Sequence, residues 1–98
     1  MAKEKRIAVT LPAGPKLEQT VERIRWAEDN GIPDGWFSDA GAPDTLTQIA
    51  AIAHETRSIR LGVAVTPVYT RTPAVIAASV NVIGQVLPGR FVMGLGSS

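Results

Sequence analysis

Short, β-branched and almost uncharged segments alternate along this chain with longer segments of helical pattern. The clearest unit contains a strand over 59–65, a helix over 73–87 that begins at Thr72-Pro73, and a strand over 91–95. A threonine can cap a helix through its hydroxyl, and a proline suits the first helical position because no amide hydrogen is needed there. Two strands joined by one helix in this length predict a parallel crossover unit.

The part of the chain before residue 59 repeats this pattern. Its expected elements are strands over 6–11 and 35–38 and helices over 16–30 and from Asp44 or Thr45 to about Thr56. Strictly alternating strands and helices with short connections form a parallel sheet with helices packed outside it. A closed (βα)8 barrel and an open doubly wound sheet share that pattern. The 98 residues would supply only about half of a barrel, which typically needs about 250 residues.

Two of the expected helices have an apolar face and termination signals. The first helix gathers Leu17, Val21, Ile24 and Ala27 on one side, and Asn30-Gly31 is suited to end it. In the second helix, Thr45 and Gln48 have the spacing of a capping box. Its apolar face consists of Leu46, Ile49, Ala50 and Ala53.

Composition excludes several classes of protein. Ten basic and nine acidic residues are interspersed, with a formal net charge of +1, so we expect neither nucleic acid nor an anionic membrane surface as a partner. The chain has no cysteine, which excludes disulfides and fits the reducing cytoplasm. No signal core follows the charged residues 1–6, because Pro12, Gly14 and Pro15 interrupt the next segment. We therefore expect a soluble cytoplasmic protein without a membrane span.

The carboxyl ends of the strands are the expected ligand site in both architectures. They correspond to Leu11-Pro12, Ser38-Asp39-Ala40, Val65-Thr66-Pro67 and Gly96-Ser97-Ser98. Asp39 is the only acid among them, and either a hydrogen bond to a ligand or a cap of the following loop would explain it.

Other candidate residues allow both a functional and a structural interpretation. Gly94–Ser98 could let backbone amides approach a ligand, although a glycine pair after a strand more often marks a turn. Arg71 could meet an anion or pair with a carboxylate. His54 is expected on the surface, and Trp26 and Trp36 are expected to pack. The sequence contains no nucleophile elbow, metal-ligand cluster or phosphate-binding loop, so the catalytic residues are unknown.

The helix over 73–87 carries no charged residue, and its only polar side chains are Ser79, Asn81 and Gln85. A helix that is apolar nearly all round is buried on more than one side. Either further parts of a longer chain cover it, or it forms a subunit interface.

Three segments resemble the bacterial luciferase-like flavin and deazaflavin oxidoreductases: LGVAVTP at 61–67, YTRTPA at 69–74 and PGRFVMGLG at 88–96. The sequence is most similar to the branch that uses coenzyme F420, which includes methylenetetrahydromethanopterin reductases and F420-dependent glucose-6-phosphate dehydrogenases. The resemblance runs from about residue 6 to the end. It implies an α/β fold in which residues 1–98 form the N-terminal half of a (βα)8 TIM-type barrel, with the order β-α-β-α-β-α-β and an incomplete C-terminal end.

The resemblance also implies a cofactor site for F420, or alternatively FMN. Its residues would be Asp39, Ala64, Val65, Thr66, Gly96 and Ser97. The family carries a non-prolyl cis peptide at the end of the third strand, which corresponds here to Ala64–Val65. The apolar helix 73–87 matches the family's dimer interface, so a homodimer is expected.

The implied function is the N-terminal segment of an oxidoreductase that transfers a hydride between a small organic substrate and the cofactor. Many relatives have a histidine directly after the aspartate, where this chain has Ala40, so a proton-transfer role is not carried over. We expect the 98 residues alone to be inactive. One alternative is a non-catalytic half barrel that self-associates without a cofactor. A further alternative is another barrel enzyme with a phosphate-type ligand at Gly94–Ser98.

Overall fold

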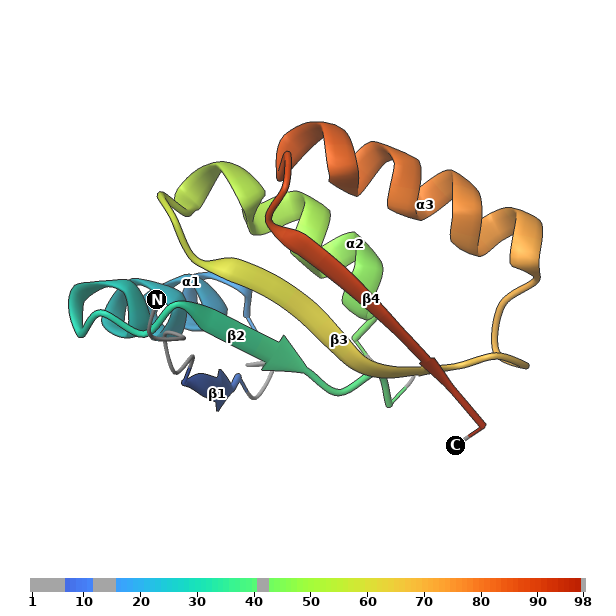
Figure 1. Cartoon of the computed structure of the whole chain (residues 1–98), viewed down its shortest axis with the longest axis horizontal. Coiled ribbons are helices and arrows are strands. Elements are labelled where there is room, and N and C mark those ends of the chain that lie inside the picture. Colours follow the sequence, from blue (N-terminus) through green and yellow to red (C-terminus); the bar gives the residue numbers. More distant parts are fainter. Residues whose placement is uncertain (1–6, 12–15, 41–42, 98) are drawn as a thin grey trace, which may run out of the picture.

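Four parallel strands lie side by side in chain order (Figure 1). The computed structural model describes residues 7–11, 16–40 and 43–97. The strands are β1 (Ala8–Thr10), β2 (Asp34–Phe37), β3 (Arg60–Pro67) and β4 (Phe91–Gly96), and the sheet order is β1-β2-β3-β4. Within the described residues, β1 and β4 each have one neighbouring strand and are therefore the edges of the sheet.

The helices cover one side of this sheet (Figure 1). They are α1 (Leu17–Asp29), α2 (Thr45–Ile52) with the short 3-10 helix η1 (Ala53–Glu55) after it, and α3 (Pro73–Val86). A doubly wound sheet reverses its strand order and carries helices on both faces. The consecutive order with helices on one side is instead that of a barrel segment, so the predicted fold class, the N-terminal half of a (βα)8 barrel, is confirmed.

The hydrophobic core fills the layer between the helices and the sheet. Its strand residues include Phe37, Leu61 and Val63, each no more than 2% exposed. The helices contribute apolar residues at helical spacing, namely Ile24, Ala27, Leu46, Ile49, Ile52 and Ile83. Burial of these side chains holds each helix against the strands that it connects.

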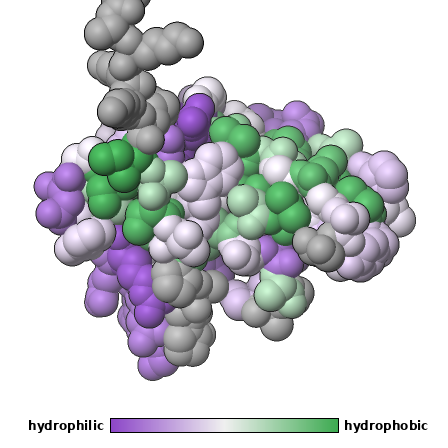
Figure 2. Space-filling view, turned by 60° about the horizontal axis from the view of Figure 1, so that its bottom comes forward, coloured by the Kyte–Doolittle hydropathy of each residue, from purple (hydrophilic) through white to green (hydrophobic). Residues whose placement is uncertain are grey.

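The other face of the sheet carries side chains that alternate with those of the core. Trp36 lies beside Gly62, and a Cβ atom on Gly62 would lie 2.2 Å from the Trp36 ring. Gly62 therefore leaves the space that the indole occupies. Figure 2, with the bottom of Figure 1 turned forward, shows hydrophobic residues gathered between more hydrophilic margins.

Most expected helix boundaries are confirmed. Gly31 and Gly89 follow α1 and α3 with positive φ angles of 72° and 71°, a conformation that glycine adopts readily. The Thr72 side chain accepts a hydrogen bond of 3.2 Å from the Val75 amide, so it caps α3 as expected. Among the described residues, no helix is long and apolar enough to cross a membrane.

Two details of the predicted helices are wrong. In α1 the buried residues are Thr20, Ile24 and Ala27. Leu17 is 49% exposed, because it lies at the margin of a groove between α1 and α2. In α2 the cap is Asp44, one residue earlier than a Thr45–Gln48 capping box requires. The expectations for residues 1–6, 12–15, 41–42 and 98 lie outside the described residues.

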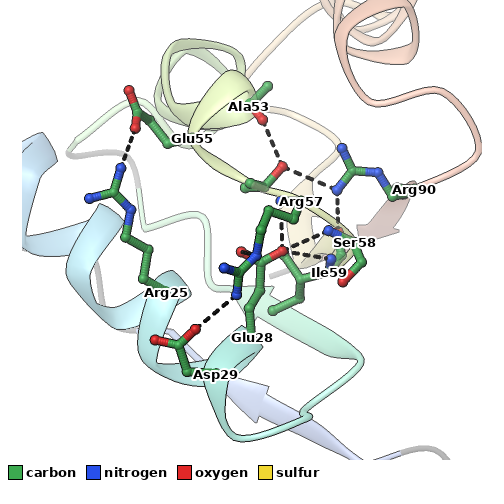
Figure 3. Close-up of polar contacts among 10 residues, drawn as sticks. Arg25, Glu28, Asp29, Ala53, Glu55, Arg57, Ser58, Ile59 and Arg90 are labelled. Carbon is green, nitrogen blue, oxygen red and sulfur yellow. Dashed lines mark hydrogen bonds and ion pairs between the residues drawn. The ribbon is translucent and has the colours of Figure 1, made fainter.

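Glu28 fixes the end of α1 to the start of β3, at the amino ends of the strands (Figure 3). Its carboxylate oxygen Oε2 accepts hydrogen bonds from the amides of Arg57, Ser58 and Ile59, at 2.7, 2.7 and 3.1 Å. Burial alone would raise the pKa of Glu28. The three amides and the nearby Arg57 charge outweigh burial and leave this pKa below its ordinary value.

Further polar contacts surround this carboxylate (Figure 3). The Arg90 Nη1 atom donates to the Ile59 carbonyl at 2.9 Å and to the Thr56 hydroxyl at 3.1 Å, which attaches the start of β4 to the same connection. The pair between Arg25 and Glu55 is exposed, and exposed pairs contribute at most about 1 kcal/mol. The buried carboxylate of Glu28 is therefore expected to contribute more than this exposed pair.

We predict that Glu28→Gln lowers the free energy of unfolding by about 1–3 kcal/mol at neutral pH, because three backbone amides lose a charged acceptor. Since the folded state lowers the pKa of Glu28, its contribution is complete above the ordinary glutamate value of about 4.3 and is lost as the pH falls through the folded value. The difference between the two proteins should therefore shrink in acid. Urea unfolding at several pH values measures it.

The matched control is Glu22→Gln, at an exposed position of the same helix, which should leave the free energy of unfolding within about 0.5 kcal/mol of the original. An equal, pH-independent effect of both substitutions would contradict the role assigned to Glu28.

Candidate functional site

Asp39 and Thr66 meet at the carboxyl ends of neighbouring strands. Asp39 follows β2 and is 8% exposed, and Thr66 is a fully buried residue of β3. The Thr66 hydroxyl donates a hydrogen bond of 3.0 Å to the Asp39 Oδ2 atom. The parallel pairing of β2 with β3 thus brings together two of the residues that the sequence assigned to a cofactor site.

Arg71 completes this contact from the loop between β3 and α3. Its Nη1 atom forms an ion pair with Asp39 Oδ2, and its Nη2 atom forms one with Asp44 Oδ1. The guanidinium is 14% exposed, and the Asp39 carboxylate raises its pKa. Of the two roles considered for Arg71, pairing with a carboxylate is the one observed, and this pairing makes it unsuited to an external anion.

Asp44 anchors the other end of the ion-pair network. It is the N-cap of α2, where its side chain accepts a hydrogen bond of 3.1 Å from the Thr47 amide. The Thr47 hydroxyl and the Arg71 guanidinium lower the pKa of Asp44. Asp44, rather than Asp39, therefore caps the element after β2.

The two carboxylate oxygens of Asp39 have different surroundings. Oδ2 receives both the Thr66 hydroxyl and the Arg71 guanidinium. Oδ1 receives no hydrogen bond from the part of the chain that the structure describes. Asp39 therefore combines a carboxylate paired with Arg71 with one oxygen that has no donor among the described residues.

The end of β3 is irregular where the resemblance places the cofactor ring. The Ala64–Val65 peptide bond is cis, as expected. Val63 pairs with Met93 and Thr66 with Leu95, so β3 contains one residue more than β4 between these two pairs. Bulges of this kind redirect side chains and are frequent next to active sites. Ala64 is exposed and Val65 is partly buried.

Val65 packs over the two glycines of β4. A Cβ atom on Gly96 would lie 2.6 Å from Val65 Cγ2, and one on Gly94 would lie 2.3 Å from the Val63 carbonyl oxygen. Both glycines belong to strand β4, so the expectation of a turn is wrong. Their lack of a side chain provides room for β3. Ser97 follows the strand and is exposed, whereas Ser98 lies outside the described residues.

His54 and Trp26 lie away from the carboxyl ends of β2, β3 and β4. His54 is exposed in η1, as expected for a surface histidine. Trp26 lies beside a hollow between β1 and α1 and is 57% exposed, so the expected packing is only partial. Sequence reasoning missed the contact of Arg71 with both aspartates, although all three residues follow strand ends. No group suited to hold a metal ion occurs among the described residues.

Comparisons with known proteins agree with this geometry. Residues 4–98 match the family model of the luciferase-like monooxygenases. The chain is 32% identical over 87 residues to the 5,10-methylenetetrahydromethanopterin reductase of Methanolobus tindarius, covering 88% of this chain and 26% of that protein. It is 35% identical over 94 residues to the F420-dependent glucose-6-phosphate dehydrogenase of Nocardia farcinica, covering 86% of this chain and 27% of that protein.

Solved structures give the same relationship. The coenzyme F420 dependent tetrahydromethanopterin reductase from Methanopyrus kandleri superimposes with a TM-score of 0.87 at 27% identity, over 98% of this chain and 28% of that one. The oxygenating constituent of 3,6-diketocamphane monooxygenase from Pseudomonas putida, in complex with FMN, shares the fold with a TM-score of 0.75 at 24% identity, over 87% of this chain and 26% of that one. The chain thus spans about a quarter of the length of these relatives.

We predict that Gly96→Ala lowers the free energy of unfolding by about 1–3 kcal/mol, because the added methyl group overlaps Val65. Val65→Ala in the same chain removes the overlapping methyl groups. The double variant should therefore lose less stability than the sum of the two single variants. Thermal and urea unfolding of the four proteins measure this difference, and strictly additive losses would contradict the proposed contact.

Proposed function

This chain belongs to the luciferase-like monooxygenase family, and on that premise we propose that it supplies the first strands and part of the cofactor site of an F420-dependent oxidoreductase. The relatives that share about a third of its residues are named as reductases of methylenetetrahydromethanopterin and as F420-dependent glucose-6-phosphate dehydrogenases. FMN is the alternative cofactor, because a structural neighbour of this fold contains it. A small organic substrate and a cytoplasmic location remain predictions.

The observation that carries the proposal is the Asp39 carboxylate, whose Oδ2 atom is held by Thr66 and Arg71 and whose Oδ1 atom has no donor among the described residues. A deazaflavin ring presents broad apolar faces and a polar edge with hydrogen-bond donors. The carboxyl ends of β2 and β3 offer two matching features. Asp39 provides a carboxylate acceptor, and Ala64, two residues before Thr66, provides a small exposed side chain. The described residues therefore fit such a ring.

The bound cofactor would supply hydride transfer, and the protein would orient it and exclude water. In this proposal Asp39 accepts a hydrogen bond from the ring, and Ala64 and Val65 lie against its apolar face. In the same proposal, Gly96 and Ser97 would contact the cofactor from the end of β4. Ala40 carries no titratable group, so a proton donor for the reaction would come from other residues.

We predict that Asp39→Asn weakens F420 binding by about tenfold or more in the complete gene product, because a charged acceptor is replaced by a neutral amide. Quenching of F420 fluorescence gives the dissociation constant, and a parallel titration with FMN identifies the preferred cofactor. Asp29→Asn provides a matched control, because Asp29 is an exposed residue at the opposite ends of the strands.

Binding of F420 or FMN that is equally tight in the Asp39→Asn variant would contradict this site. An unaltered gene product that self-associates but binds neither cofactor would favour the alternative of a non-catalytic half barrel.

We also propose that α3 forms a homodimer interface. This helix carries no charged residue, yet Val75 and Val82 are 51% and 53% exposed. A groove of about 340 Å³ separates α3 from α2, and its lining is largely apolar. It consists of Leu46, Thr47, Ala50, Ala78, Ser79, Val82 and Ile83. An identical helix from a second copy would match this uncharged surface.

Replacing Val82 by glutamate should shift the gene product toward the monomer, because a charge would have to be buried in an apolar interface. Sedimentation velocity over a range of concentrations measures the shift. Gln19→Glu introduces the same charge on α1 and should leave the association unchanged. An interface on α3 would be contradicted if both variants changed the association equally, or if the Val82 substitution had no effect on it.

A further inference from the structure

Arg71 is held between two carboxylates that belong to different elements. Its Nη1 atom contacts Asp39 after β2, and its Nη2 atom contacts Asp44 at the start of α2. Arg71 itself lies two residues before Pro73, the first residue of α3. One guanidinium therefore links the end of β2 to the amino-terminal ends of two helices.

The contacts of Arg71 select one oxygen of Asp39. Arg71 and Thr66 both donate to Oδ2, which leaves Oδ1 without a donor among the described residues. Two donors on one oxygen restrict rotation of the carboxylate about its side-chain bonds. The Asp39 side chain is 2% exposed, so water offers it little alternative hydrogen bonding.

We propose that Arg71 is a positioning residue, which holds the Asp39 carboxylate oriented so that Oδ1 faces the polar edge of the bound deazaflavin. This inference rests on the proposed function and adds a residue that acts through Asp39. Arg71 is itself occupied by the two carboxylates, so it contributes by orienting Asp39 and not by touching the cofactor.

An arginine is better suited to this position than a lysine. The guanidinium presents several donors in a rigid planar fork, and here two different nitrogens reach two different carboxylates. A lysine ammonium is a compact point charge on a flexible stem. It would keep a positive charge near Asp39 but would not hold both partners in the same geometry.

A double-mutant cycle in the complete gene product tests the inference, with F420 affinity measured by fluorescence titration. Arg71→Met should weaken F420 binding by about tenfold, because Asp39 loses a charge-assisted hydrogen bond that orients it. In a protein that already carries Asp39→Asn, the same change should weaken binding by no more than about twofold, because residues that act as a unit are not additive. Arg71→Lys should give an intermediate loss.

Two measurements separate positioning from general loss of structure. Arg25→Met removes a surface arginine at the other ends of the strands and should leave F420 affinity unchanged. Circular dichroism and thermal unfolding verify that each variant is folded. If Arg71→Met does not fold, the cycle is run with Arg71→Lys. The loss of F420 affinity that Arg71→Lys causes in the original protein should then be absent in the Asp39→Asn background.

The outcomes are distinct. A loss of equal size in the original protein and in the Asp39→Asn background would overturn the inference, because Arg71 would then act independently of Asp39. The inference would also be overturned if neither Arg71 substitution changed F420 binding while Asp39→Asn still weakened it. The proposed function would stand in that case. Failure of the unaltered protein to bind F420 and FMN would overturn the proposed function and this inference together.

Discussion

Parallel strands constrain this molecule more than any other feature. Each strand must be reached by a crossover, and each crossover here is a helix packed on the same side of the sheet. The carboxyl ends of all four strands therefore lie at the same end of the sheet. This constraint places Thr66 and Arg71 beside Asp39, although they lie 27 and 32 positions away in the sequence.

Each end of the strands contains a buried carboxylate, and the two carboxylates have different partners. At the amino ends, three backbone amides converge on one oxygen of Glu28, so that a buried charge serves the connection between α1 and β3. At the carboxyl ends, one oxygen of Asp39 accepts from both Thr66 and Arg71, and the other has no donor among the described residues. The first arrangement stabilises the fold. The second maintains a charged acceptor at the end where barrels of this kind bind their ligands.

The sequence was sufficient to predict the elements, because hydrophobic periodicity, prolines and helix caps are local signals. Thr72 and Gly31 behave as their local patterns indicate. Contacts between distant segments were harder to predict. Gly94 and Gly96 resembled a turn because nothing in their neighbourhood reveals Val65, whose side chain comes from another strand. Likewise, the partners of Arg71 depend on the bulge in β3 and on where α2 begins.

The consecutive strand order also bears on how the chain acquires its structure during synthesis. Each strand pairs with the one made immediately before it, so every new strand and helix can add to an existing surface as it leaves the ribosome. Each parallel pair nevertheless has to wait for an entire helical crossover, as in Leu61 with Phe91, and such non-local pairing folds slowly. The growing edge is then a row of unpaired backbone groups on the newest strand, and such edges associate readily with other strands. In the described sheet, the outer edges of β1 and β4 are therefore the places where association with a strand of another molecule would begin.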